Sequence, residues 1–105
     1  MDASARRDTE SRGAGIQSLE KGLRVLTTIQ HAGRPMRLND IAAAAGMTPS
    51  MAHGYLVSLV RTGFVVQDRL SGLYDLGDAA LQLGLASLSR TDFLGLARTA
   101  ISELA

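Results

Sequence analysis

The sequence of 105 residues contains no cysteine, which excludes a disulfide framework, a thiolate nucleophile and a cysteine-based zinc site. No apolar run approaches the roughly 18 residues that a membrane span needs, and the N-terminal stretch MDASARRDTE lacks the apolar core of a secretory signal. We therefore expect a cytoplasmic protein with no membrane association. One small domain fits in this length, and a domain of about 60 residues is often marginally stable without a partner subunit.

The motifs that commonly mark catalysis are also missing. The chain has no G-x-S-x-G, no H-E-x-x-H and no phosphate-binding glycine loop, and its carboxylates are scattered. The two histidines, His31 and His53, are accompanied by neither cysteine nor clustered carboxylates. We expect no enzymatic activity, no metal site and no cofactor.

A strong basic excess is absent as well, since the formal net charge is only +1. The imbalance lies in residues 18–77, which hold six basic and four acidic residues, whereas residues 1–17 are balanced and residues 78–105 are slightly acidic. A mild positive excess on the central segment agrees with a phosphate-bearing partner without requiring one.

That central segment contains LNDIAAAAGMTPSMAHGYLVSLVRT, residues 38–62, which predicts two helices joined by a tight turn. Asn39 is the expected N-cap of the first helix. Gly46 is expected to end it, because glycine adopts the positive φ of a helix C-terminus without steric penalty. Thr48 and Pro49 predict the start of the second helix as its N-cap and its first helical residue.

The second predicted helix runs to Gly63 and has two distinct faces. Its apolar face is formed by Ala52, Tyr55, Leu56 and Leu59, and the opposite face with its flanks by Ser50, Met51, His53, Gly54, Val57, Ser58 and Arg61. One face packs and the other is free, which is typical of a helix-turn-helix whose second helix lies in the DNA major groove. An ordinary helical hairpin within a bundle is the alternative for this stretch alone.

A supporting helix is predicted before this pair. Ser18 is its expected N-cap, His31 its expected end, and its apolar stripe contains Leu19, Leu23, Leu26 and Ile29. Residues 1–17 mix glycine, serine and charges without periodicity, so we expect no fixed structure there. Arg6 and Arg7 are either a basic arm or solvated side chains.

A β-hairpin is predicted directly after the second helix. Residues 64–67 and 73–76 are rich in strand-forming side chains, and residues 68–72 have turn chemistry. Two strands alone are barely stable in water, so this hairpin must pack on the helices as the wing of a winged helix. Arg69 at its tip can reach the minor groove or a phosphate. Arg34 and Arg37, before the helix pair, either reach phosphates or remain solvated.

The C-terminal part predicts two further helices. Asp78 opens the first, residues 78–90, whose leucines have few partners within so small a domain. We therefore expect a homodimer contact along Asp78 to Leu88. Thr91 is expected to cap the second, within residues 91–105, and because its apolar pattern stops midway we expect the chain to be a fragment of a longer protein.

Three segments together carry a family resemblance: SLEKGLRVLTTI, RLNDIAAAAGMTPSMAHGYLVSLVRTGFVVQD and GLYDLGDAALQLG. They resemble the N-terminal domain of the IclR family of bacterial transcriptional regulators over residues 18–89. The resemblance implies a mainly α winged helix-turn-helix with a small β-hairpin and a linker helix, which binds palindromic operator DNA as a dimer. It also implies control by a small organic effector through a C-terminal domain, of which residues 91–105 resemble only the first helix.

The recognition helix departs from the family pattern at two positions. Met51 and Gly54 stand where family members usually have threonine and arginine, and an arginine could hold a guanine edge with two hydrogen bonds. The expected DNA-binding residues are Arg34, Arg37, Thr48, Pro49, Ser50, Met51, His53, Gly54, Val57, Arg61 and Arg69. A winged-helix module for protein interaction or dimerisation, without specific DNA binding, is the alternative that Met51, Gly54 and the small net charge favour.

Overall fold

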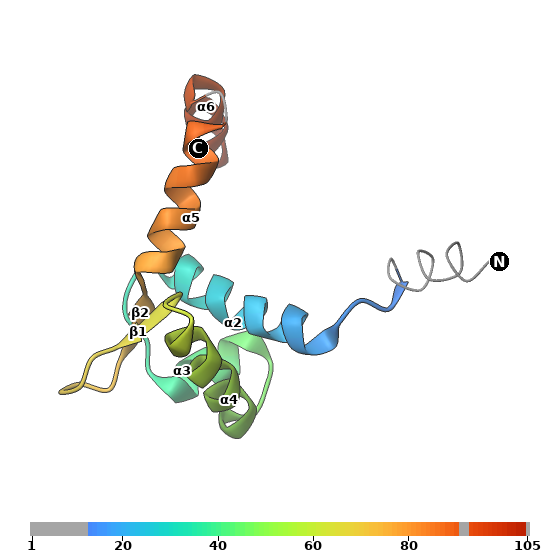
Figure 1. Cartoon of the computed structure of the whole chain (residues 1–105), viewed down its shortest axis with the longest axis vertical. Helices are drawn as coiled ribbons and strands as arrows, with labels where there is room; N and C mark the ends of the chain where they lie inside the picture. Colours follow the sequence, from blue (N-terminus) through green and yellow to red (C-terminus); the bar gives the residue numbers. More distant parts are fainter. Residues whose placement is uncertain (1–12, 91–92, 105) are drawn as a thin grey trace.

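The computed structural model describes residues 13–90 and 93–104, and its architecture is a mainly helical winged helix-turn-helix (Figure 1). In chain order the elements are α2 (Gln17–Ala32), α3 (Leu38–Ala45), α4 (Pro49–Arg61), β1 (Val65–Gln67), β2 (Tyr74–Leu76), α5 (Asp78–Ser89) and α6 (Phe93–Leu104). The two strands are antiparallel, with Val65 opposite Leu76 and Gln67 opposite Tyr74. The predicted combination of helices and one small hairpin is confirmed.

Helix α2 begins at Gln17, two residues earlier than an N-cap at Ser18 predicts. Ile16, and not Ser18, occupies the N-cap position, and no side chain caps this end of the helix. The prediction was wrong because the helical hydrogen-bond pattern already starts at the Ile16 carbonyl, which accepts from the Glu20 amide at 3.1 Å. Arg6, Arg7 and the rest of residues 1–12 lie outside the described residues.

The turn between α3 and α4 forms as its glycine predicts. Gly46 has a φ of 72°, and the Met47 amide donates to the Ala42 carbonyl at 3.0 Å, so the last carbonyls of α3 are satisfied. The predicted N-cap at the other end of α3 was wrong. Asn39 lies inside the helix, because Leu38 is already helical and the Arg37 carbonyl accepts from the Ile41 amide at 3.0 Å.

The start of α4 agrees with the prediction in atomic detail. The Thr48 Oγ1 accepts a hydrogen bond from the Met51 amide at 3.2 Å, and Pro49 occupies the first turn, where no amide hydrogen is needed. The helix ends at Arg61, and the predicted stop at Gly63 follows with a φ of 83°. Local chemistry therefore defines both ends of this helix.

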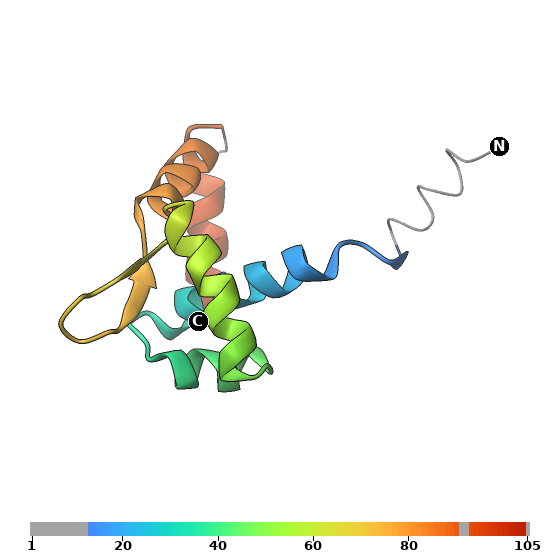
Figure 2. The same cartoon turned by 60° about the horizontal axis from the view of Figure 1, so that its bottom comes forward.

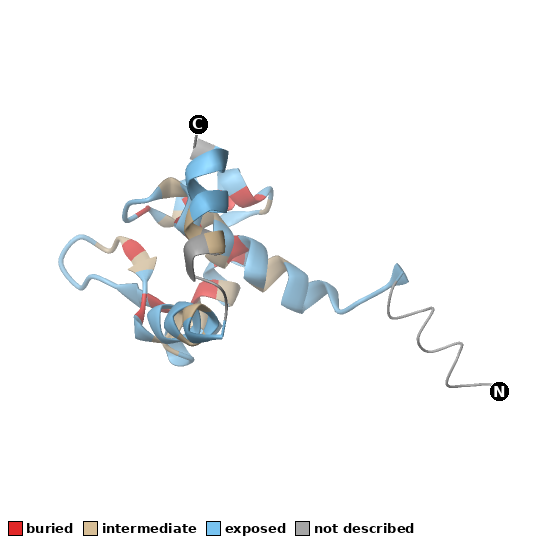
Figure 3. Cartoon of the chain, turned by 90° about the horizontal axis from the view of Figure 1, so that it is seen from above, coloured by how far each residue is buried: buried red, intermediate tan, exposed pale blue. Residues whose placement is uncertain are grey.

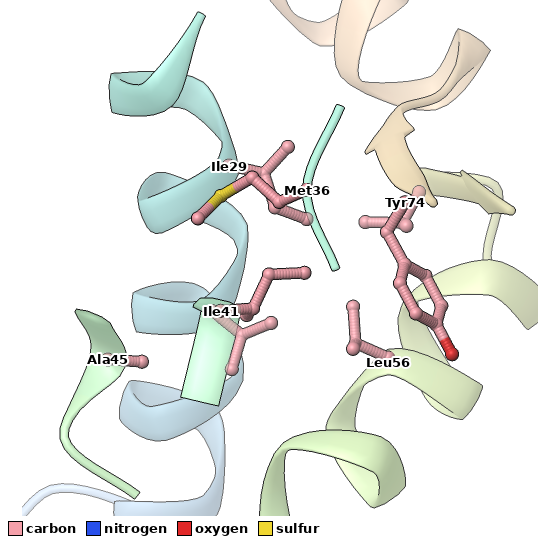
Figure 4. Close-up of a cluster of buried hydrophobic side chains, with 8 residues drawn as sticks. Ile29, Met36, Ile41, Ala45, Leu56 and Tyr74 are labelled. Atoms are coloured by element: carbon pink, nitrogen blue, oxygen red, sulfur yellow. The ribbon is translucent and has the colours of Figure 1, made fainter. Parts of the chain in front are cut away.

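The hydrophobic core lies where α2, α3, α4 and the hairpin meet (Figure 3). Its buried side chains are Val25, Ile29, Met36, Ile41, Ala45, Leu56, Val65 and Tyr74, several of which converge in Figure 4. Ala42 on α3 and Ala52 on α4 are also buried. Their small side chains allow the two helices to approach closely, as a helix-turn-helix requires.

Backbone contacts dock the hairpin on the helices. Met36 exchanges two hydrogen bonds with Tyr74 of β2, of 2.9 and 2.8 Å, so the loop between α2 and α3 adds a one-residue bridge to the sheet. At the open end of the hairpin the Gly77 amide donates to the Phe64 carbonyl at 2.8 Å. A Cβ at Gly77 would collide with the Gly63 carbonyl oxygen, so this approach depends on glycine. The predicted need of the wing for support is thereby met.

Helix α5 leaves the domain at the end of the hairpin and stands away from the core (Figures 1 and 2). None of its residues is buried. Helix α6 follows, and its predicted cap, Thr91, lies outside the described residues.

We predict that Gly46→Ala lowers the free energy of unfolding by about 1 to 2 kcal/mol, measured by urea denaturation. The substitution forces an L side chain into the left-handed region, while the space around a new Cβ is open, so steric collision does not contribute. Gly54→Ala is the matched control. It also adds a methyl group in open space, but inside α4, and should raise stability by about 0.5 to 1 kcal/mol. Equal effects of the two substitutions would contradict this explanation.

Candidate nucleic-acid interface

Helix α4 presents one side to the core and leaves the other uncovered. Ala52 and Leu56 have no exposed surface, and Tyr55 and Leu59 are half-buried, as the apolar pattern predicts. On the other side the structure exposes Thr48, Pro49, Ser50, Met51, His53, Gly54 and Arg61, with Val57 half-buried. These residues form one continuous strip from the N-terminus to the C-terminus of α4.

The N-terminal end of this strip is suited to binding an anion. Pro49 and Ser50 are exposed in the first turn of α4, where free backbone amides and the helix dipole favour negative charge. Thr48 uses its oxygen as an acceptor for the cap, which leaves its hydroxyl hydrogen for another partner. Gly54 follows one turn later, and the space that a Cβ would occupy there is open, so another backbone can approach closely.

The four predicted arginines are all exposed, and within residues 13–90 and 93–104 none of them forms an ion pair. Arg34 makes one local hydrogen bond, of 3.3 Å, to the carbonyl of Pro35. Arg37 adjoins Met36, whose backbone pairs with β2, so it lies beside the hairpin. Arg61 lies at the C-terminal end of α4 and Arg69 in the turn of the hairpin. Their charges are therefore available to an external anion.

A groove of about 230 Å³ separates the uncovered strip of α4 from the hairpin. Its lining residues are His53, Leu56, Val57, Val60, Arg61, Gln67 and Tyr74. The structure thus brings His53, Val57 and Arg61 of the prediction together with two residues that the sequence did not point to. Gln67 and Tyr74 face each other across the hairpin, and only that register could have indicated their place.

The tip of the wing is an ordered turn. The Asp68 carboxylate accepts from the Ser71 amide at 2.7 Å, and the Gln67 side-chain amide donates to the Gly72 carbonyl at 3.1 Å. The hydrogen bonds from Ser71 lower the pKa of the Asp68 carboxyl, because they stabilise its ionised form. The turn projects Arg69 into solvent beside Leu70, which is 98% exposed.

Acidic side chains lie on another side of the wing. Asp68 and Asp75 border a shallow surface depression with Pro35, Val66 and Leu73. Carboxylates repel phosphate, so this side of the hairpin disfavours a bound anion. The positive charge of the wing therefore lies at Arg69, and among the described residues no carboxylate lines the groove on the side that borders α4.

A short helix pair with a glycine turn, an uncovered second helix and a docked hairpin define the winged helix-turn-helix class of DNA-binding proteins. Comparison with known families specifies the class further, since residues 18–69 match the IclR helix-turn-helix domain. By this domain the chain belongs to the IclR family of transcription regulators.

Relatives and solved structures agree with the family. The glycerol operon regulatory protein of Streptomyces coelicolor is 42% identical over 73 residues, 70% of this chain and 29% of that protein. The transcriptional repressor IclR of Escherichia coli is 28% identical over 89 residues, 85% of this chain and 32% of that protein. HmgR of Pseudomonas aeruginosa superposes with a TM-score of 0.71 at 36% identity, covering 85% of this chain and 37% of its own.

A second solved structure, an IclR-family regulator from Brucella abortus, gives a TM-score of 0.67 at 32% identity over 80% of this chain and 32% of its own. The matches thus span about a third of each relative. Within the described ranges, no helix is both long and apolar enough to cross a membrane.

Proposed function

We propose that this chain is the sequence-specific DNA-binding part of a transcriptional regulator that binds a palindromic operator as a homodimer. The observation that carries the proposal is the uncovered strip of α4 beside a wing that is docked on the same domain. Relatives named as an operon regulatory protein and a transcriptional repressor support the same function. Its place of action is then the cytoplasm, where bacterial DNA lies.

Base reading is assigned to the N-terminal half of α4 in the major groove. Ser50 and His53 supply hydrogen-bonding groups, and Met51 offers apolar contact to a thymine methyl group. Gly54 allows the helix backbone to lie close to the bases but reads none of them. Because no arginine stands in this half of the helix, sequence-dependent DNA shape contributes a larger share of specificity than a bidentate guanine contact would.

Phosphate contacts are assigned to the exposed arginines. Arg34 and Arg37 adjoin the start of the helix pair, and Arg69 extends from the wing into or beside the minor groove. The net charge is only +1, but phosphate binding depends on the charge near the contact. In the described part of the chain the four predicted arginines form no ion pair, so their positive charge is available locally.

Dimerisation is assigned to α5. Leu81 and Leu85 lie on one side of this helix and Leu83 on another, and they are 61%, 54% and 63% exposed. A helix with apolar residues around its circumference is normally buried. A hollow along α5, between Leu76 and Leu88, offers a place for the same helix of a second copy. A two-fold pair of domains would then match the two halves of a palindrome.

Regulation is assigned to a C-terminal domain that binds a small organic effector, as the family resemblance implies. Helix α6 would be the first helix of that domain. No effector-binding residue is assigned within this chain.

DNA binding is tested by measuring how the affinity for duplexes selected from a random pool depends on salt concentration. Affinity should fall steeply from about 50 to 200 mM salt, because phosphate contacts release counterions. Arg69→Ala should weaken binding to all sequences alike and reduce the magnitude of the salt slope by about 1. The control Leu70→Ala removes the neighbouring exposed side chain without its charge and should leave the slope unchanged. Lack of binding to any duplex at micromolar protein would favour the interaction-module alternative.

His53→Ala should reduce the ratio of affinities for operator and random DNA by about tenfold, because one base contact is lost. His31→Ala, which removes the exposed histidine in the last turn of α2, should leave that ratio unchanged. Competition binding with both duplexes measures the two ratios. An unaltered ratio in His53→Ala would remove His53 from the base-reading residues.

Leu85→Glu should convert dimers to monomers in light scattering, since a charge would be buried between two copies of α5. Gln82→Glu places the same charge on the same helix at an exposed polar position and should leave the mass unchanged. A monomeric mass for the unchanged protein at high concentration would contradict the proposed dimer.

A further inference from the structure

The Tyr74 side chain has a polar group without a partner. The residue is only 5% exposed and packs in the core with Ile29, Met36 and Leu56 (Figure 4). Its hydroxyl forms no hydrogen bond with any described residue, and Figure 4 shows it directed toward α4. Buried tyrosine hydroxyls normally find a partner, because desolvation without one is unfavourable. We therefore expect the hydrogen-bond partner of this hydroxyl to belong to another molecule.

Tyr74 belongs to the lining of the groove between α4 and the hairpin, and its hydroxyl is directed toward α4 (Figure 4). Its polar neighbours there are His53, Arg61 and Gln67. The guanidinium of Arg61 forms no ion pair in the described part of the chain, and no carboxylate lines the groove. The amide nitrogen of Gln67 already donates to the Gly72 carbonyl, and His53 is assigned to base reading, so Tyr74 and Arg61 remain as donors. Such donors select an oxyanion.

We propose that Tyr74 and Arg61 together bind one phosphate of the DNA backbone in this groove. The inference rests on the proposed function, with α4 in the major groove and the hairpin at the adjacent minor groove. Between these two grooves runs the sugar-phosphate backbone of one strand. The groove of about 230 Å³ lies between the corresponding two elements, so a backbone phosphate seated in it would face Tyr74.

The two donors have separable physical effects. The tyrosine is neutral, so its hydrogen bond adds affinity without adding a released counterion, whereas the arginine adds both. A phosphate contact carries no base information, so neither residue changes specificity. Tyr74 also ties the contact to the core, since its ring is packed there while its hydroxyl faces the DNA. It acts as a positioning residue that sets the distance between the backbone and α4.

The test compares Tyr74→Phe with Tyr55→Phe. Both substitutions remove one hydroxyl oxygen, but Tyr55 packs against Gly22 of α2 and does not line the groove. Tyr74→Phe should weaken binding to random and selected duplexes alike by about tenfold, with the salt slope unchanged. Its urea midpoint should not fall, because the hydroxyl has no partner in the protein. Tyr55→Phe should bind as the unchanged protein does.

Ethylation interference adds a readout that a purely structural role would not alter. One phosphate in each half-site should interfere with binding of the unchanged protein and of Tyr55→Phe, and that signal should weaken in Tyr74→Phe. Unchanged affinity and footprint in Tyr74→Phe, with normal binding by the unchanged protein, would overturn this proposal alone. If the unchanged protein binds no duplex, both proposals fail.

Discussion

The close crossing of α3 and α4 is the contact on which the remaining structure depends. Ala42 and Ala52 are buried at this crossing, and Leu56 extends the contact into the core. A larger side chain at either alanine would separate the helices and displace α4 from α2. Because this crossing uses one side of α4 completely, the opposite side is left without any partner in the domain. The candidate interface thus follows from the packing of the core.

The hairpin forms a second wall beside this uncovered side of α4, and a groove lies between them. Its backbone bridge from Tyr74 to Met36 ties the wing to the loop before α3, and the close approach at Gly77 ties its other end to the residues after α4. A wing held at both ends has a defined distance from Arg61. The groove between α4 and the hairpin is lined by Tyr74, whose side chain also packs in the core.

Charged side chains of opposite sign lie close together on the wing of this protein. Arg69 projects from the wing tip while Asp68, whose pKa is lowered by Ser71, remains ionised next to it. The acidic side of the wing repels an anion, whereas the positive charge of Arg69 attracts one, so the two sides of the wing differ in the partner that they favour. An almost neutral total charge keeps the non-specific attraction between this chain and nucleic acid small.

Local chemistry was sufficient to predict where α4 begins and ends, which of its sides packs, and where the hairpin lies. Thr48, Pro49 and Gly63 act within one turn of their own position, so the helix ends that they define can be predicted from the sequence. Caps that depend on neighbouring backbone carbonyls, at Ile16 and Arg37, were assigned to the wrong residues. The groove was not predictable, since Arg61, Gln67 and Tyr74 meet only through strand register and through docking on Met36. The sequence alone determined the elements and the uncovered face, whereas the tertiary structure decided which polar groups share a site, because that depends on contacts between distant segments.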